Sequence, residues 1–127
     1  MKQMIVFSIV LLLVTALICC GSTILIHRVL DRMEDIHEQA LSCTDIDDAE
    51  GALVALTQLA QLWSKADYWM EMLTDHADIH NVREQIVSAK ALLEHDDIAQ
   101  YHQSMALVRE GLDHIRRSES LSLSNLF

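Results

Sequence analysis

The chain has 127 residues, of which none is proline and only three are glycine, and its aromatic residues make up 5%. Tight turns, phosphate-binding loops and β-hairpins draw on proline and glycine, so this composition argues against an all-β fold, a Walker loop and a Rossmann fingerprint. The formal net charge is −10. An acidic surface of this kind repels phosphate, which argues against nucleic acid as a partner.

An uncharged apolar segment occupies residues 4–26, directly after a very short N-terminal tail. As a helix it would be roughly 34 Å long, enough to cross a hydrocarbon core of ~30 Å. We therefore interpret residues 1–26 as a short tail and a transmembrane anchor. Two alternatives are a secretory signal cleaved near Ser22 and a lipoprotein signal modified at Cys20. Against both, the apolar run extends beyond the ~7–15 residues of a signal core.

The positive-inside rule gives almost no orientation for this segment, because the two flanks have nearly the same positive charge: Lys2 and the α-amine before it, and Arg28 and Arg32 after it. A short tail followed by a long C-terminal domain favours an N-in, C-out arrangement. We expect a single-pass protein of the cell membrane with an extracytoplasmic domain.

Beyond residue 26, apolar residues recur every three or four positions, the spacing of amphipathic helices. The predicted fold is all-α, with the anchor continuing as a juxtamembrane helix over residues 27–41 and then a small antiparallel bundle of three to four helices, over residues 47–117. Polar runs at 42–48, 74–76 and 94–97 separate the helices, with Asp47 and Asp96 as the expected N-caps. Residues 118–127 alternate leucine with serine, which predicts an extended apolar tail.

A face with metal-ligand spacing opens the third predicted helix, where His76 and His80 lie one turn apart. Asp78 and Glu84 complete a possible ligand set, since zinc needs imidazoles that converge on it. Ala77 stands where the zincin motif places its catalytic glutamate, which argues against a metalloprotease. The alternative is that these residues cap the helix and line its solvated face. No cofactor and no small-molecule substrate are indicated.

Contact residues are expected in two places. Tyr68 and Trp69 lie at the edge of the apolar face of the second predicted helix, and a partly exposed tryptophan is a common binding hot spot. The tail adds four more candidates, which are Leu123, Asn125, Leu126 and Phe127. Cys43 is the lone cysteine outside the span, so it is either free or forms a disulfide with Cys43 of a second chain.

In its layout the chain resembles a family of small single-span membrane proteins from spore-forming Gram-positive bacteria that is classed as a domain of unknown function. The resemblance covers the span, the segment around Trp63 and Trp69, the stretch Asp75–Ile79 and the closing stretch Glu119–Phe127. It implies the architecture and the localisation and no catalytic residues, and it directs attention to His76 and to Asn125–Phe127.

From these patterns we expect a non-enzymatic, membrane-anchored helical interaction or scaffold protein. Its partners would be the lipid bilayer and either another protein or a second copy of itself. Two alternatives are a metal-binding helical domain that uses the His76/His80 face, and a homo-oligomeric stalk in which the third and fourth helices zip between chains.

Overall fold

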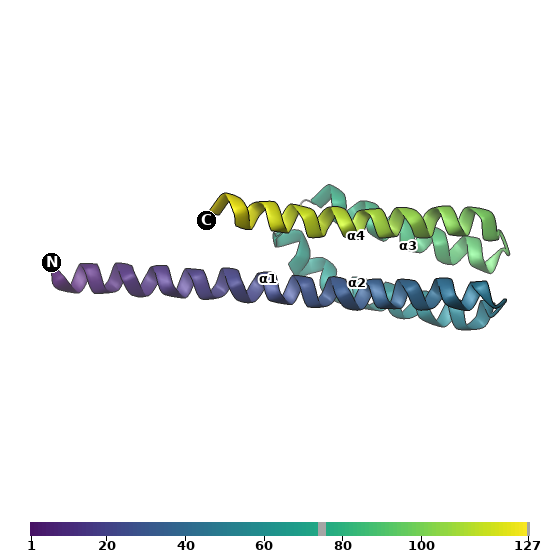
Figure 1. The fold of residues 1–127 in the computed structure, drawn as a ribbon, viewed down its shortest axis with the longest axis horizontal. Helices are drawn as coiled ribbons and strands as arrows, with labels where there is room; N and C mark the ends of the chain where they lie inside the picture. The colour runs from purple at the N-terminus through teal and green to yellow at the C-terminus, as the bar shows by residue number, and fades with distance from the viewer. Residues whose placement is uncertain (74–75, 127) are drawn as a thin grey trace.

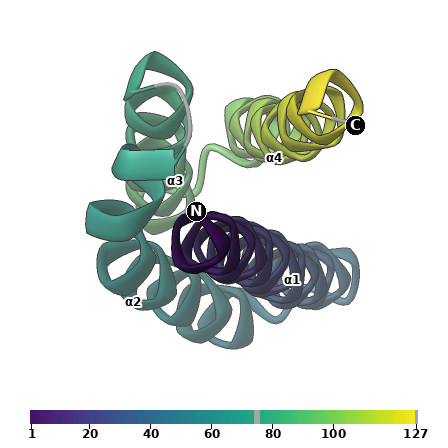
Figure 2. The same ribbon diagram turned by 90° about the vertical axis from the view of Figure 1, so that its left-hand side faces the viewer.

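The computed structural model describes residues 1–73 and 76–126, and of Leu73 and residues 121–126 only the backbone. These ranges form four helices, with no strand among them: α1 (Lys2–Asp45), α2 (Ala49–Leu73), α3 (His76–Glu94) and α4 (Ile98–Leu126). The helices alternate in direction, and each packs on its two neighbours in a ring that α1 and α4 close (Figures 1 and 2). The all-α prediction is thereby confirmed.

α1 has two different parts. No residue from Met1 to Leu25 is buried, and most of this apolar part projects beyond the other three helices (Figure 1). From Ile26 onward one face is buried in the core. Among the described residues α1 is the helix that is long and apolar enough to cross a membrane, although a signal sequence would have the same properties. The predicted juxtamembrane helix is thus one of the four helices of the bundle.

The core forms along the faces that the apolar spacing predicts. On α3 the apolar residues at this spacing, which we call the α3 ladder, are all buried: Ile79, Val82, Ile86, Ala89 and Leu93. The corresponding α4 ladder is Ile98, Tyr101, Met105, Val108, Leu112 and Ile115, and all but Ile98 are buried. Burial of each large apolar side chain contributes roughly 1.5–3 kcal/mol to folding. The largest fully buried side chains come from all four helices and include Leu30, Met33, Leu56, Leu59, Met70, Ile79, Ile86, Tyr101, Met105 and Leu112.

Two helix connections have the same construction. Asp47 and Asp96 adopt positive φ angles of 59° and 58°. The next residue, Asp48 or Asp97, donates its N–H to the carbonyl of Cys43 or Leu92 and so closes the preceding helix in a Schellman arrangement. The carboxylates of Asp48 and Asp97 then accept the N–H groups of Gly51 and Gln100, at 3.0 and 3.3 Å.

The predicted N-caps are therefore wrong by one residue at both connections. The first aspartate of each pair takes the left-handed conformation that ends one helix, which aspartate tolerates better than most residues. Only the second aspartate is then placed to cap the next helix. The predicted turn also begins too early, since residues 42–45 are still helical and the Thr44 hydroxyl donates to the Leu41 carbonyl at 2.8 Å.

The predicted extended tail is wrong as well, because α4 continues through Leu126. No glycine or proline follows Gly111 to stop the helix, and serine is compatible with it: the Ser120 hydroxyl donates to the Arg116 carbonyl at 3.1 Å. Phe127 lies outside the described residues. The break predicted at 74–76 is confirmed by the end of α2 and the start of α3, while Thr74 and Asp75 themselves are not described.

The bundle has two distinct ends. The far end consists of the connections at residues 46–48 and 95–97. The near end is where α2 ends and α3 begins, and it faces the projecting half of α1 (Figure 1). α4 runs past this near end toward the N-terminus of α1.

Candidate functional site

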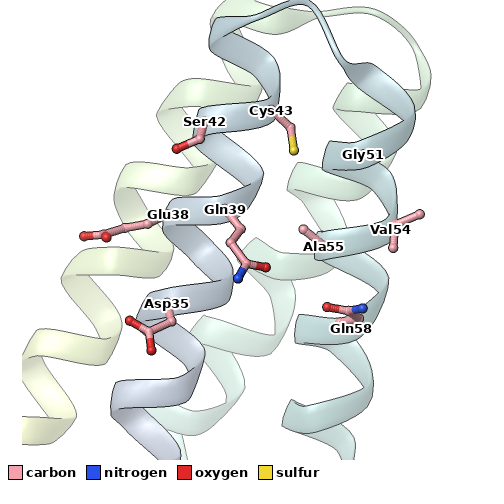
Figure 3. Close-up of a pocket in the computed structure, with 9 residues that line it drawn as sticks. All are labelled: Asp35, Glu38, Gln39, Ser42, Cys43, Gly51, Val54, Ala55 and Gln58. Atoms are coloured by element: carbon pink, nitrogen blue, oxygen red, sulfur yellow. The ribbon is translucent and has the colours of Figure 1, made fainter.

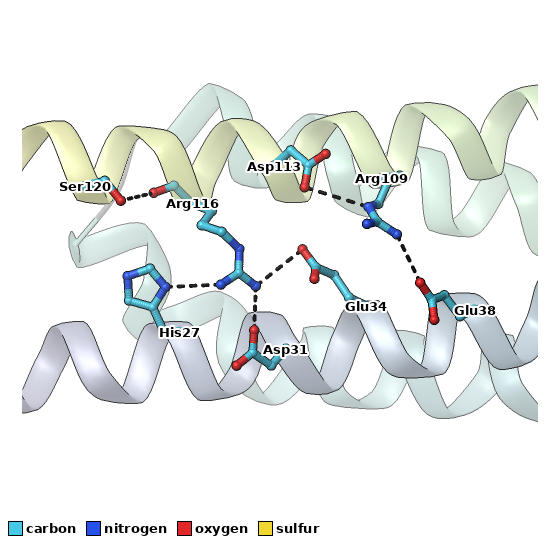
Figure 4. A network of polar contacts seen from close by, with 8 residues as sticks. All are labelled: His27, Asp31, Glu34, Glu38, Arg109, Asp113, Arg116 and Ser120. Atoms are coloured by element: carbon cyan, nitrogen blue, oxygen red, sulfur yellow. Dashed lines mark hydrogen bonds and ion pairs between the residues drawn. The ribbon is translucent and has the colours of Figure 1, made fainter.

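The seam between α1 and α4 is closed by Arg116 (Figure 4). Its guanidinium donates to the Asp31 carboxylate at 2.7 Å and lies 3.3 Å from both the Glu34 carboxylate and the His27 Nδ1. Burial opposes the charge on Arg116, but the two carboxylates outweigh it and raise the pKa of the guanidinium. Burial also raises the pKa of the Glu119 carboxyl, an effect that His27 partly offsets.

Farther along the same seam, Arg109 lies 3.5 Å from Glu38 of α1 and 3.7 Å from Asp113 of its own helix. Comparable ion pairs join the other helices. Arg83 of α3 pairs with Asp67 and Glu71 of α2. Among the described residues, these charged groups connect neighbouring helices through ion pairs.

The predicted metal ligands do not converge. His76 lies 3.4 Å from Glu71 of α2, whereas His80 lies 3.1 Å from Glu84 of its own helix. Asp78 instead faces α4, where it lies 3.2 Å from His114. Within residues 1–73 and 76–126, no three His, Cys, Asp or Glu residues are grouped so that they could hold a metal ion. The geometry thus favours separate ion pairs over a shared metal site, and whether these residues cap α3 stays a prediction.

Cys43 lines a surface groove between α1 and α2 (Figure 3). Its thiol is half-buried and points toward α2, so close to Gly51 that a side chain at that position would meet the sulfur at 3.0 Å. A disulfide between two chains would require this thiol to turn away from the groove. The Cys43–Cys43 bridge stays a prediction.

The predicted contact residues of α2 differ in exposure. The Tyr68 side chain is 78% exposed, and Met72, one turn farther on, is 71% exposed. Trp69 is half-buried and packs against the core. Tyr68 and Met72 therefore form an exposed apolar pair at the near end. The side chains of Leu123, Asn125 and Leu126 are not described, but their backbone belongs to the last turns of α4.

A buried histidine that the sequence analysis did not single out lies in the core. His37 is 2% exposed, and its Nε2 donates to the Met105 carbonyl at 2.6 Å, while Nδ1 has no partner among the described residues. Burial lowers the pKa of His37, and Arg109 lowers it further, against the opposing effects of the Met105 carbonyl and of Glu38 and Glu34. The sequence does contain a signal for this burial, because His37 lies between Met33 and Ala40, which are buried on the same helix.

Tyr101 is the other titratable group in the core. Burial raises the pKa of its phenol, and the neighbouring Thr44 hydroxyl partly offsets this. Both Tyr101 and His37 lie between α1 and α4, so the seam that closes the bundle is polar at several depths.

A second missed feature is a set of exposed cations. Arg28, Arg32, Lys65 and Arg117 are exposed and make no ion pair with any described residue. The signal for it is present in the sequence, because residues 33–64 and 91–108 contain no lysine or arginine. Only the fold, however, shows that these two cation-free stretches meet at the far end.

A family model described as a domain of unknown function, DUF4363, matches residues 22–126. The chain belongs to the DUF4363 family. The match begins within the apolar part of α1 and continues through all four helices, so the DUF4363 unit coincides with the bundle. No curated protein and no solved structure matches the chain. The expected membership of a family of unknown function is thus confirmed in its coarse form, and the description of DUF4363 assigns no activity.

Proposed function

We propose that this DUF4363 protein is a single-pass membrane protein whose bundle is a non-enzymatic contact module on the extracytoplasmic side. The observation that best supports the proposal is the continuity of α1. One unbroken helix supplies both an apolar rod without a buried residue and one wall of the core.

The apolar part of α1 has the surface expected of a membrane anchor. The exposed apolar surface of residues 4–25 is costly to leave in water. In a bilayer the same surface is favourable, and the hydroxyls of Thr15 and Thr23 donate to helix carbonyls one turn earlier, at 2.9 and 3.0 Å. A span of this length needs no other element of the protein to cross the hydrocarbon core.

A contact role is supported by how the bundle uses its polar side chains. Arg83, Arg109 and Arg116 each pair with carboxylates across a helix seam. The surface left for contacts includes the exposed Tyr68 and Met72, near the end of α2. We propose that the near end of the bundle is the contact surface.

A stalk built by zipping α3 and α4 between chains is less well supported. The apolar ladders of both helices are buried within one chain, so they offer no free face for a second copy. Self-association through another surface would have to use residues outside these ladders.

Extraction and labelling of the full chain in cells test the proposal. We expect the protein to stay in the membrane fraction during extraction with alkaline carbonate. We also expect mass spectrometry of the mature protein to recover its N-terminal peptide. An Ile46→Cys variant with Cys19, Cys20 and Cys43 changed to serine should react with a membrane-impermeant maleimide in intact cells, because Ile46 is 75% exposed at the far end. Carbonate-soluble protein that begins beyond Ser22 would overturn the anchor.

A further inference from the structure

Charge is distributed unevenly along the bundle. The far end has Asp45, Asp47, Asp48 and Glu50 at one connection and Glu94, Asp96 and Asp97 at the other, within two stretches that lack lysine and arginine. The exposed cations lie toward the near end instead. Arg32 and Lys65 line one groove between α1 and α2, and Arg117 lines a groove beside the start of α3.

Five acidic residues of the near half lie within ion-pair distance of a basic residue on another helix. Asp31 and Glu34 pair with Arg116. Asp67 and Glu71 pair with Arg83, and Asp78 lies 3.2 Å from His114. Outside these pairs, the described near half has four exposed cations, Arg28, Arg32, Lys65 and Arg117, alongside the carboxylates of Asp35 and Glu119, which make no ion pair either.

The end of α4 reaches the level of the apolar span. Arg116 lies opposite His27 and Asp31, immediately after the span ends at Ile26. From Arg116 the helix continues to Leu126, about 15 Å farther, and it runs antiparallel to α1. This segment contains three leucines and four serines, and Glu119 is its one charged residue after Arg117. Such a composition suits the boundary between headgroups and hydrocarbon.

We propose that the near end of the bundle rests on the anionic phospholipid headgroups of the bilayer that α1 spans. Arg28, Arg32, Lys65 and Arg117 contact the headgroups, Tyr68 and Met72 enter the interface, and the last turns of α4 lie along the anchor at the membrane boundary. The inference rests on the proposed function, because α1 must cross a bilayer for the near end to meet one.

Distances explain how an acidic domain can approach an anionic surface. Screening limits electrostatic interactions to about 8–10 Å at physiological salt. The far connections lie about 27 Å beyond His27 along α1, so the repulsion of their carboxylates from the membrane is screened. The exposed cations of the near end lie within the range in which anionic lipids attract lysine and arginine. Exposed tyrosine and methionine add apolar contact at the depth where aromatic residues gather.

The test uses the full chain in vesicles of phosphatidylcholine, alone or mixed with phosphatidylglycerol. An environment-sensitive fluorophore is attached to Met72→Cys, in a background with Cys19, Cys20 and Cys43 changed to serine. The matched control carries the fluorophore on Ile46→Cys, which is equally exposed but lies at the far end. Lipids with a nitroxide on the headgroup quench any fluorophore that reaches the interface.

We expect headgroup quenching at position 72 to exceed that at position 46 several-fold in the anionic vesicles, and to fall when phosphatidylglycerol is omitted. Changing Arg28, Arg32, Lys65 and Arg117 together to glutamine should reduce quenching at 72 to the level at 46. Lys90→Gln, which removes a cation away from the near end, should leave it unchanged.

The outcomes separate the two proposals. Release of the protein from the vesicles by carbonate would overturn the anchor itself. Retention with equal quenching at both positions would overturn the headgroup contact alone. Quenching at position 72 that is insensitive to phosphatidylglycerol and to the glutamine variant would also overturn the headgroup contact. So would a Met72→Cys thiol that a maleimide labels in vesicles but not in native membranes, since a protein partner would then cover this surface.

Discussion

The helices end differently at the two ends of the bundle. At the far end, two tight connections use paired aspartates, one in the left-handed conformation and one as an N-cap. At the near end, α1 and α4 do not stop but run on beyond the core. The far end is therefore closed by local hydrogen bonds, whereas the near end depends on contacts between residues distant in sequence. We propose that the bilayer completes the near end.

The largest effect on stability is expected at the near end, from Arg116→Ala. The change removes a charge-assisted partner from Asp31 and Glu34, and it should lower the free energy of unfolding by about 2 kcal/mol. Arg117→Ala, at the adjacent exposed position, should change it by less than about 0.5 kcal/mol. Urea titration in detergent, followed by tryptophan fluorescence, reports on the bundle because Trp63 and Trp69 both lie in α2. Equal effects of the two variants would contradict the assigned role of Arg116.

Gly111→Ala tests how closely α3 and α4 approach. A methyl group at this position would collide with the Val82 side chain. Overpacking costs about 1–3 kcal/mol, and the better helix propensity of alanine returns about 1 kcal/mol, so we expect a net loss of stability of up to about 2 kcal/mol. Gly21→Ala is the control, since nothing lies within 4 Å of its added methyl. A Gly111→Ala variant that is about 1 kcal/mol more stable than wild type, which is the full propensity gain, would show that the two helices separate without cost.

Acidification should weaken the seam between α1 and α4 through His37. Because burial lowers its pKa below the unfolded value of 6.5, the unfolded chain binds a proton first as the pH falls. The free energy of unfolding should therefore decrease from about pH 6.5 downward until the folded-state pKa is passed, by at most about 1.4 kcal/mol per pH unit.

The His37→Gln variant should lack this part of the pH dependence. The same urea titrations, repeated between neutral and mildly acidic pH, measure it as the difference between wild type and variant. His95→Gln, at an exposed site of the far end, controls for the loss of a histidine. An identical pH dependence of wild type and His37→Gln would remove His37 as the cause.

The smallest effects are expected at the far end. Asp48→Ala and Asp97→Ala should each cost about 1 kcal/mol, because each removes one N-cap hydrogen bond. Asp47→Gly and Asp96→Gly should stabilise the bundle slightly, by less than about 1 kcal/mol, since glycine adopts a positive φ without strain. Thermal unfolding of the four variants measures these effects. Clearly unequal effects of the two connections would contradict their common construction.

The helices and the buried ladders were predictable because spacing along one helix is a local property. On α3, all of Ile79, Val82, Ile86, Ala89 and Leu93 are buried as their spacing predicts. The positions of the caps were less accessible, since Asp47 and Asp48 have the same side chain and only the backbone conformation distinguishes their roles. The end of α4 was missed because alternating leucine and serine is compatible with both a strand and a helix.

The candidate site was less predictable than the fold, because it depends on which helices become neighbours. Nothing local indicates that Arg116 meets Asp31, from which 85 residues separate it. His76 and His80 have the spacing of a metal site, yet each faces a different carboxylate. The uneven distribution of lysine and arginine is present in the sequence. It became informative only once the fold showed which parts of the other helices lie beside which part of α1.

The shared helix also has a mechanical consequence. In the proposed membrane arrangement, the bundle would behave as a lever fixed to the span, since α1 passes from its apolar part into the core without a break. Its arm from Ile26 to Asp45 is about 29 Å long, so a change of about 10° in the tilt of the span would swing the distal aspartates sideways by about 5 Å. In that arrangement, the tilt of the span would determine where the distal aspartates stand relative to the membrane.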